Sequence, residues 1–141
     1  MQRMTEDEAW AFLETGDRPA VFASVRADGQ PHVVPTWYAV EGRTIVFTTW
    51  HTTVKASNLR QDDRVAMTIQ DPIPPYDYVA LEGTAELIDD LADCRAISTR
   101  LGAKYMGAAR AEEFGARNGV AGELVVRVTP SRIHGFRGVA S

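Results

Sequence analysis

The sequence predicts a mainly β protein in which an antiparallel sheet curls into a closed or partly closed barrel flanked by helices. Six segments are rich in β-branched and aromatic residues and are separated by turns or helices. Strands and helices do not alternate regularly along the chain, which argues against a parallel nucleotide-binding sheet. At 141 residues with 45% hydrophobic residues, the chain is long enough to bury a substantial core. We therefore expect a single domain spanning residues 1–141.

The composition argues against several classes of function. A formal net charge of −4 is unlike that of a general nucleic-acid-binding protein. The only cysteine is Cys94, which excludes an intramolecular disulfide and a paired-cysteine metal site. No secretory signal pattern is present, and no stretch approaches the ~20 apolar residues of a transmembrane helix. We expect a cytoplasmic protein with neither a nucleic-acid nor a membrane partner.

The predicted strands follow from local pattern. Asp28-Gly29 is a strong hairpin signal, whereas Pro35 cannot donate a ladder hydrogen bond and predicts a bulge or a sheet edge. Gly83 predicts a second bulge. The six strands are expected at Ala20–Arg26, Pro31–Val40, Thr44–Thr49, Val65–Asp71, Val79–Ile88 and Glu123–Thr129, with Ile133–Phe136 as a short extension.

Three helices are predicted between and before these strands. The first begins with a capping box formed by Thr5 and Glu8 and ends at Gly16. The second is a short crossover helix over Thr52–Leu59. The third is capped by Asp89 or Asp90 and carries an apolar stripe from Leu91 to Tyr105 that includes Cys94, which predicts a buried structural thiol. Residues 115–122 are expected to form a loop.

Hydroxyl groups, one lysine and one asparagine lie where the third strand meets the crossover helix. They are Thr48, Thr49, Thr52, Thr53, Lys55 and Asn58. Free amides and the helix dipole make a helix start a suitable phosphate site. The competing interpretation is that Thr53 is an ordinary N-cap and Lys55 a solvated helix residue. Pro35 and Trp37 on the neighbouring strand could supply an apolar wall for a flat ring.

The histidines do not indicate a metal site. His32, His51 and His134 are widely separated, and none stands at metal-ligand spacing from another. We therefore predict no bound metal.

Three patterns together resemble the pyridoxamine 5′-phosphate oxidase-like, flavin-binding split-barrel proteins. They are DGxPHVVPxWY from Asp28 to Tyr38, TxxKxxNLxxDxRV from Thr52 to Val65, and YxxVxLEGTAEL from Tyr76 to Leu87. Within that superfamily, the chain is most similar to the deazaflavin-dependent oxidoreductases that use coenzyme F420. The resemblance extends over about residues 5–137.

The resemblance implies a six-stranded, Greek-key split barrel that forms a homodimer with two cofactor grooves between the protomers. It implies that the isoalloxazine-like ring lies along the strand that carries His32, Val33, Pro35 and Thr36. Thr48 and Thr49 would contact the ribityl chain and phosphate. Lys55 matches the phosphate-binding lysine, and Asn58 supports its loop. Thr53 departs from the pattern, because many relatives carry an arginine there.

The implied reaction is hydride transfer from reduced coenzyme F420 to an unsaturated small-molecule substrate, with the cofactor supplying the chemistry. The proton donor is open among Tyr38, Tyr76, Tyr78 and His51. Trp37, Trp50 and Tyr76 are weaker candidates for the substrate pocket, and Trp50 is equally suited to a dimer interface. The alternatives are an FMN-dependent oxidase or reductase, a non-catalytic flavin- or haem-binding protein, and a barrel without a cofactor.

Overall fold

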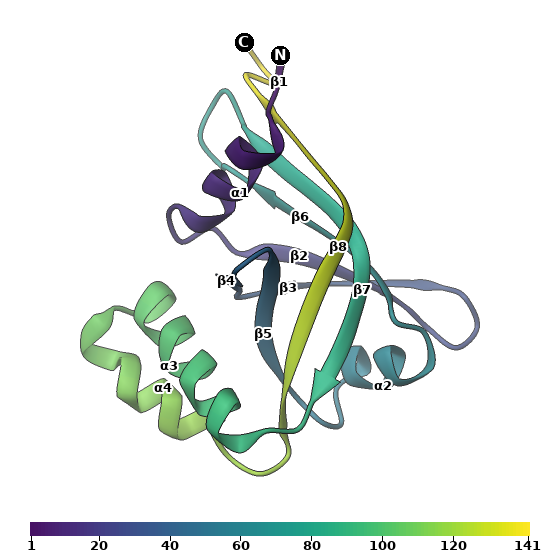
Figure 1. Ribbon diagram of the computed structural model, residues 1–141, viewed down its shortest axis with the longest axis vertical. Helices are drawn as coiled ribbons and strands as arrows, with labels where there is room; N and C mark the ends of the chain where they lie inside the picture. The colour runs from purple at the N-terminus through teal and green to yellow at the C-terminus, as the bar shows by residue number, and fades with distance from the viewer.

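The computed structural model describes all residues from 1 to 141. Its strands are β1 (Gln2–Arg3), β2 (Ala20–Val25), β3 (Pro31–Thr36), β4 (Ala39–Glu41), β5 (Thr44–Trp50), β6 (Arg64–Gln70), β7 (Tyr78–Ile88) and β8 (Glu123–Arg137). Its helices are α1 (Glu6–Glu14), α2 (Val54–Gln61), α3 (Leu91–Met106) and α4 (Ala111–Asn118), with a 3₁₀ turn at Ala108–Arg110 before α4. Figure 1 shows the strands curving around one another, with the helices on the outside and at the ends.

The sheet is antiparallel throughout and follows the order β3-β2-β6-β7-β8-β5-β4, with β1 paired to the end of β8. Strands β3 and β4 are consecutive in the chain but lie at opposite edges of this order. Since only Trp37 and Tyr38 connect them, the sheet must curl until its two edges approach each other. No ladder joins those edges, so the barrel is split there, and the predicted fold class is confirmed.

The core fills the inside of this curl. Phe22 on β2 and Phe47 on β5 meet edge to face with ring centroids 5.0 Å apart, and both are fully buried. This contact joins strands that lie far apart in the sheet order, as expected for a barrel interior. Side chains alternate along each strand, so Val21 and Ala23 on β2 point away from this core.

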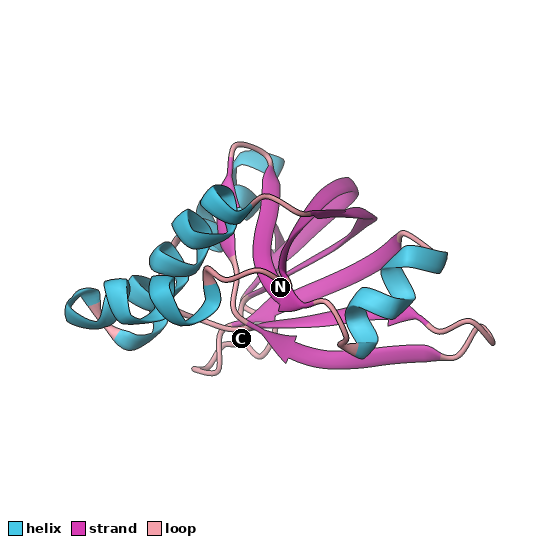
Figure 2. Ribbon diagram, turned by 90° about the horizontal axis from the view of Figure 1, so that it is seen from below, coloured by secondary structure: helices cyan, strands magenta, loops and turns pink.

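Helices α3 and α4 form a separate layer to one side of the strands, as Figure 2 shows. Their close approach depends on glycine. A Cβ atom at Gly115 of α4 would overlap the Thr99 hydroxyl of α3, and one at Gly102 would lie 2.7 Å from the Cβ of Phe114. The prediction of a loop over residues 115–122 was therefore wrong for residues 115–118, which belong to α4, and is confirmed for residues 119–122, which form the turn before β8. The glycines allow the two helices to pack closely.

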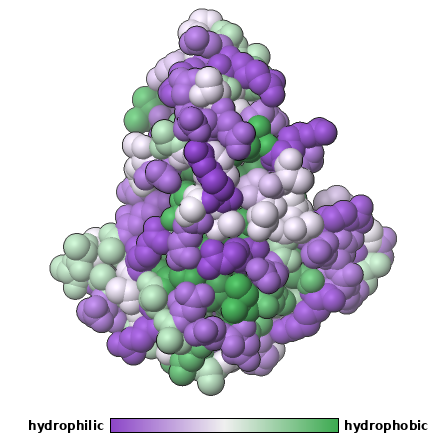
Figure 3. Space-filling model, in the orientation of Figure 1, coloured by the Kyte–Doolittle hydropathy of each residue, from purple (hydrophilic) through white to green (hydrophobic).

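Two further expectations are corrected. The segment from Pro31 to Val40 forms two strands, because the chain turns at Trp37 and Tyr38 to pass from one sheet edge to the other. The C-terminal strand is continuous from Glu123 to Arg137. With β1 added, the sheet has eight strands where six were predicted. Figure 3 shows a mostly hydrophilic surface, with apolar atoms gathered over the lower parts of β7 and β8.

Several local predictions are confirmed. Thr5 and Glu8 form the capping box, and Asp90 caps α3. Strand β3, which carries Pro35, is an edge strand. The β7–β8 register shifts at Gly83, where a Cβ atom would overlap the backbone carbonyl of Thr129.

Candidate cofactor site

The end of β5 and the start of α2 form the first part of the site. Thr53 is the N-cap of α2, and its hydroxyl accepts a hydrogen bond from the amide of Ala56 at 3.2 Å. The hydroxyls of Thr49 and Thr53 lie 2.8 Å apart and share a hydrogen bond. The amides of Val54 and Lys55 occupy the first two helical positions, where the helix itself offers no acceptor. The structure thus gathers amides and hydroxyls that can bind an anion.

Lys55 is half-buried in the first turn of α2 and is the only basic residue there, since Arg60 lies in the last turn. Burial lowers the pKa of Lys55, and the nearby Glu123 carboxylate acts in the opposite direction. Glu123 begins β8 and is the register partner of Trp50 at the end of β5. Burial raises the pKa of Glu123, whereas Thr48 and Lys55 oppose that rise.

Glu123 was missed by reasoning from sequence. It lies far from Lys55 in the chain, and only the antiparallel pairing of β5 with β8 brings the two together. Thr48 and Thr49 are adjacent in β5, and their side chains point to opposite faces of the sheet, as successive side chains of a strand do. Thr49 is buried and contacts Thr53, whereas Thr48 is half-buried on the face that carries Glu123.

Asn58 fixes α2 to the barrel. Its side-chain amide donates to the hydroxyl of Ser24 on β2 at 3.0 Å, and both residues are buried. Ser24 is the register partner of His32 on β3, and the Nδ1 atom of His32 is buried without a hydrogen-bond partner. Asn58 therefore has a supporting position, and His32 belongs to the same end of the barrel.

The four predicted residues of β3 lie on two faces. His32 and Thr36 are half-buried on the inner side, whereas Val33 and Pro35 are exposed on the outer side. One uninterrupted strand face therefore cannot present all four to a single ring. The alternation of strand residues was visible in the sequence and could have predicted this division.

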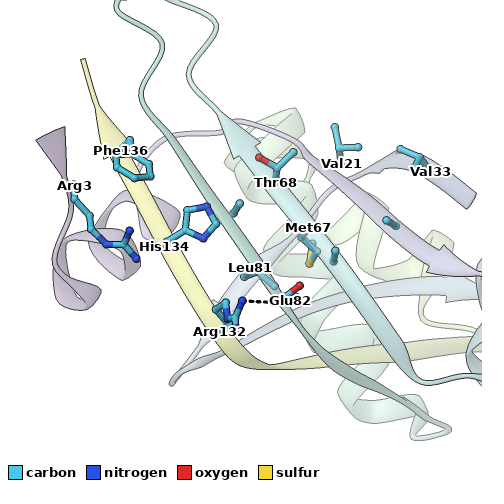
Figure 4. A pocket seen from close by; sticks show the side chains of 13 residues that line it. Arg3, Val21, Val33, Met67, Thr68, Leu81, Glu82, Arg132, His134 and Phe136 are labelled. Atoms are coloured by element: carbon cyan, nitrogen blue, oxygen red, sulfur yellow. Dashed lines mark ion pairs between the residues drawn. The ribbon is translucent and has the colours of Figure 1, made fainter. Parts of the chain in front are cut away.

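Val33 lies at an apolar groove on the outer face of the sheet, with a volume of about 790 Å³ (Figure 4). We call this the outer groove; its lining includes Val21, Val33, Thr68, Arg132, His134 and Phe136. Val21 and Val33 are 41% and 58% exposed, and they lie diagonally across the β2–β3 pair on one face of the sheet, where Val21 is opposite Pro35 and Val33 is opposite Ala23. An ion pair between Arg132 and Glu82, 3.4 Å apart, borders the groove.

The corner between β3 and β4 is tightly fixed. The indole of Trp37 stacks on the ring of Tyr105 with centroids 5.0 Å apart and an interplanar angle of 9°. Tyr38 is fully buried, and its hydroxyl donates to the carbonyl of Leu13 at 2.7 Å. Tyr38 is therefore unavailable as a proton donor to a ligand. Trp37 also borders a small pocket of about 390 Å³ with Pro35, Thr36 and Phe114.

Trp50 and Tyr76 lie apart from that pocket. Trp50 is 43% exposed and contacts the ring of His51 beside the turn that contains Gly122. Gly122 has a φ of +100°, and a Cβ atom there would lie 2.5 Å from Cη2 of the Trp50 ring. Tyr76 lies in the β6–β7 loop, at the opposite end of β6 from α2. Within one protomer, Tyr76 therefore lies away from the start of α2.

No three histidine, cysteine, aspartate or glutamate side chains lie together in a way that could hold a metal ion. None of the helices has the length and apolar character needed to cross a membrane.

A family model and several solved structures match this chain. The family model described as pyridoxamine 5′-phosphate oxidase matches residues 5–137. The crystal structure of the conserved hypothetical protein Rv2991 from Mycobacterium tuberculosis is 26% identical, with a TM-score of 0.84, and the match covers 96% of this chain and 86% of that one. A structure named F420 reductase is also 26% identical, with a TM-score of 0.69 and coverage of 86% and 93%.

A third structure shows the fold alone. The FAD-binding protein from Mycobacterium smegmatis is 23% identical, with a TM-score of 0.65, and the match covers 96% of this chain and all of that one. No curated protein matches the sequence significantly. The family model spans nearly the whole chain and includes every residue of the candidate site. The chain therefore belongs to the pyridoxamine 5′-phosphate oxidase family.

Proposed function

We propose that this protein is an oxidoreductase that uses reduced coenzyme F420 to transfer hydride to an unsaturated small molecule. The observation that carries the proposal is the group of donors at the start of α2, within the region that the family model matches. Membership of an oxidoreductase family and similarity to a structure named F420 reductase support the choice of a flavin-type cofactor.

The chain offers a donor set that suits the cofactor phosphate. The set consists of the amides of Val54 and Lys55, the hydroxyls of Thr49 and Thr53, and the Lys55 ammonium, all of which belong to the junction between β5 and α2. Thr53 supplies a hydroxyl and no charge, so Lys55 provides the only cation of this turn. When bound, the deazaflavin would supply the hydride chemistry; the protein would bind the phosphate and orient the ring.

We further propose that the protein is a homodimer that uses the outer groove as its interface. Apolar side chains exposed together on a sheet face commonly mark a surface that is covered by a partner. Val21 and Val33 lie in this groove, and Val33 belongs to the strand expected to line the ring. A second copy would bury these valines and enclose a cofactor between the chains.

FMN is the competing cofactor, with oxidase or reductase activity on the same fold. A haem-binding or non-catalytic flavin-binding protein is the third possibility. Haem would need an axial ligand, and the exposed His51 donates a 3.1 Å hydrogen bond from Nδ1 to the Gly122 carbonyl. The single cation in the first turn of α2 favours a cofactor whose phosphate carries one negative charge.

Titration of the purified protein with coenzyme F420, FMN and haem, followed by fluorescence or absorbance, tests the proposal. We expect saturable binding of coenzyme F420. Unsaturated substrates should be reduced only when reduced coenzyme F420 is present. Tight binding of FMN without any response to the deazaflavin would refute the choice of cofactor. Light scattering tests the assembly, and a monomer at working concentration would contradict the shared groove.

A further inference from the structure

Glu123 stands at the proposed phosphate site because of strand register. It is the partner of Trp50 in the β5–β8 ladder, and the amide of His51 donates to the carbonyl of the preceding Gly122 at 2.9 Å. These bonds hold the start of β8 against the end of β5, immediately before α2. Opposite residues of a ladder share a face, and so do residues two apart along a strand, so the Glu123 side chain lies on the face that carries Thr48. Its charge also acts on Lys55 at the start of α2. Thr48 and Lys55 are both expected to contact a phosphate.

The Lys55–Glu123 pair leaves the site with little net positive charge. Both side chains are half-buried, and no salt bridge joins them directly. Lys55 is the only basic residue in the first turn of α2, and Thr53 adds no charge. An anion that binds here is attracted by the Lys55 ammonium and by the helix amides, but it is also repelled by the Glu123 carboxylate.

This balance distinguishes two kinds of phosphate. A phosphomonoester carries about −1.5 to −2 charges at pH 7, whereas a phosphodiester carries only one. Lys55 and the helix start can balance a single charge, and the second charge of a monoester would face Glu123. A like charge in a half-buried setting is screened less than one in open solvent. The difference in charge between the two phosphates should therefore change their binding affinities at this position.

We propose that Glu123 makes the site selective for a phosphodiester monoanion over a phosphomonoester dianion. This inference rests on the proposed function. It assigns to Glu123 the preference for a deazaflavin with an extended, diester-linked tail over FMN, whose phosphate is terminal. Burial already raises the pKa of Glu123, and a bound dianion would raise it further. The carboxyl would then either take up a proton from solvent or remain charged beside the phosphate, and both outcomes weaken binding of the dianion.

The test compares wild type with Glu123→Gln, which keeps the shape of the side chain and removes its charge. Dissociation constants are measured by fluorescence for coenzyme F420, FMN and riboflavin, which has the FMN ring without its phosphate. We expect wild type to bind FMN no more tightly than riboflavin. In Glu123→Gln, the affinity for FMN should rise roughly tenfold relative to riboflavin, the scale of one removed like-charge contact, while that for coenzyme F420 changes little.

Two controls keep the result interpretable. Glu86→Gln removes the same charge from an exposed position on β7 and should leave all three affinities unchanged. Glu123→Asp keeps the charge and should retain the wild-type preference. Equal changes in FMN and coenzyme F420 affinity, or no change, in Glu123→Gln would overturn the role of Glu123 and leave the proposed function standing. Failure of wild type to bind any of the three would overturn the proposed function, and this inference with it.

Discussion

Replacing Tyr105 with phenylalanine should destabilise the corner that joins the two sheet edges. The Tyr105 hydroxyl accepts a hydrogen bond from the amide of Tyr38 at 3.2 Å and donates to the carbonyl of Arg18 at 3.0 Å. Phenylalanine would keep the 5.0 Å stack on Trp37 but would leave a part-buried amide and a part-buried carbonyl without this partner. The carbonyl of Tyr38 would still accept from Lys104 at 2.8 Å.

The expected loss follows from these two groups. A fully buried donor or acceptor left unsatisfied costs about 1–3 kcal/mol. Both groups here are only part-buried and each can regain part of this loss from water, so together they should lower the free energy of unfolding by about 1–3 kcal/mol. For a chain of this size, Tm should fall by roughly 3–12 °C. Burial raises the pKa of Tyr105 to about 12, so its hydroxyl remains protonated and the loss should be the same from pH 6 to pH 9.

Thermal unfolding gives the first measurement, and hydrogen exchange at the Tyr38 amide gives the second. The matched control is Tyr76→Phe, which removes a hydroxyl from a residue that is 38% exposed and should change Tm by less than about 1 °C. If Tyr105→Phe also leaves Tm unchanged, or if the Tyr38 amide keeps its wild-type protection, the hydroxyl does not hold this corner and the reasoning fails.

Three more predictions concern the phosphate site, the outer groove and the buried thiol. Lys55→Ala should weaken binding of coenzyme F420 by about 1–3 kcal/mol, as expected for a lost charge-assisted hydrogen bond. Arg60→Ala, in the last turn of α2, is the control and should leave this affinity unchanged. If Lys55→Ala and wild type bind equally well in a titration, Lys55 does not belong to the site. Val33→Glu should convert the dimer to a monomer, as measured by light scattering. The monomer should remain folded, with a fall in Tm no larger than the loss of the dimer interface causes. An intact dimer would exclude Val33 from the interface. Burial raises the pKa of Cys94 from 9.0 to about 11. Between those values the unfolded chain loses this proton before the folded chain does, so the stabilisation is present below pH 9 and is lost as the pH rises to 11. Urea unfolding of wild type should therefore lose more stability over this range than Cys94→Ala, and parallel losses would contradict the assignment.

Much of the fold could be predicted because its signals are local. The capping box of Thr5 and Glu8, the Asp28-Gly29 turn and the Asp90 cap each act within a few residues, and each is present in the structure. Helix α4 was missed for the opposite reason. Gly115 lowers helix propensity locally, and only the tertiary contact with Thr99 of α3 explains why glycine is needed there.

The candidate site could be predicted in part. Thr53 and Lys55 lie at a helix start that the sequence indicates, and the structure joins Thr53 to Thr49 there. Glu123 has no local signal, because its place beside Lys55 depends on the pairing of β5 with β8. The outer groove likewise depends on strands β2, β6, β7 and β8 meeting in one sheet, and no single segment reveals it.

The strand order also has a consequence for the way the chain folds. The β2–β3 and β6–β7 hairpins connect residues close in sequence, but β5 pairs only with β4 and with β8, near the C-terminus. Pairings between distant segments require closing a long loop and form slowly. The pair of β5 and β8 is also what brings Glu123 to Lys55. During synthesis on the ribosome, the two hairpins can therefore form while the cofactor end is still incomplete, and that end is assembled only when the last strand has been made.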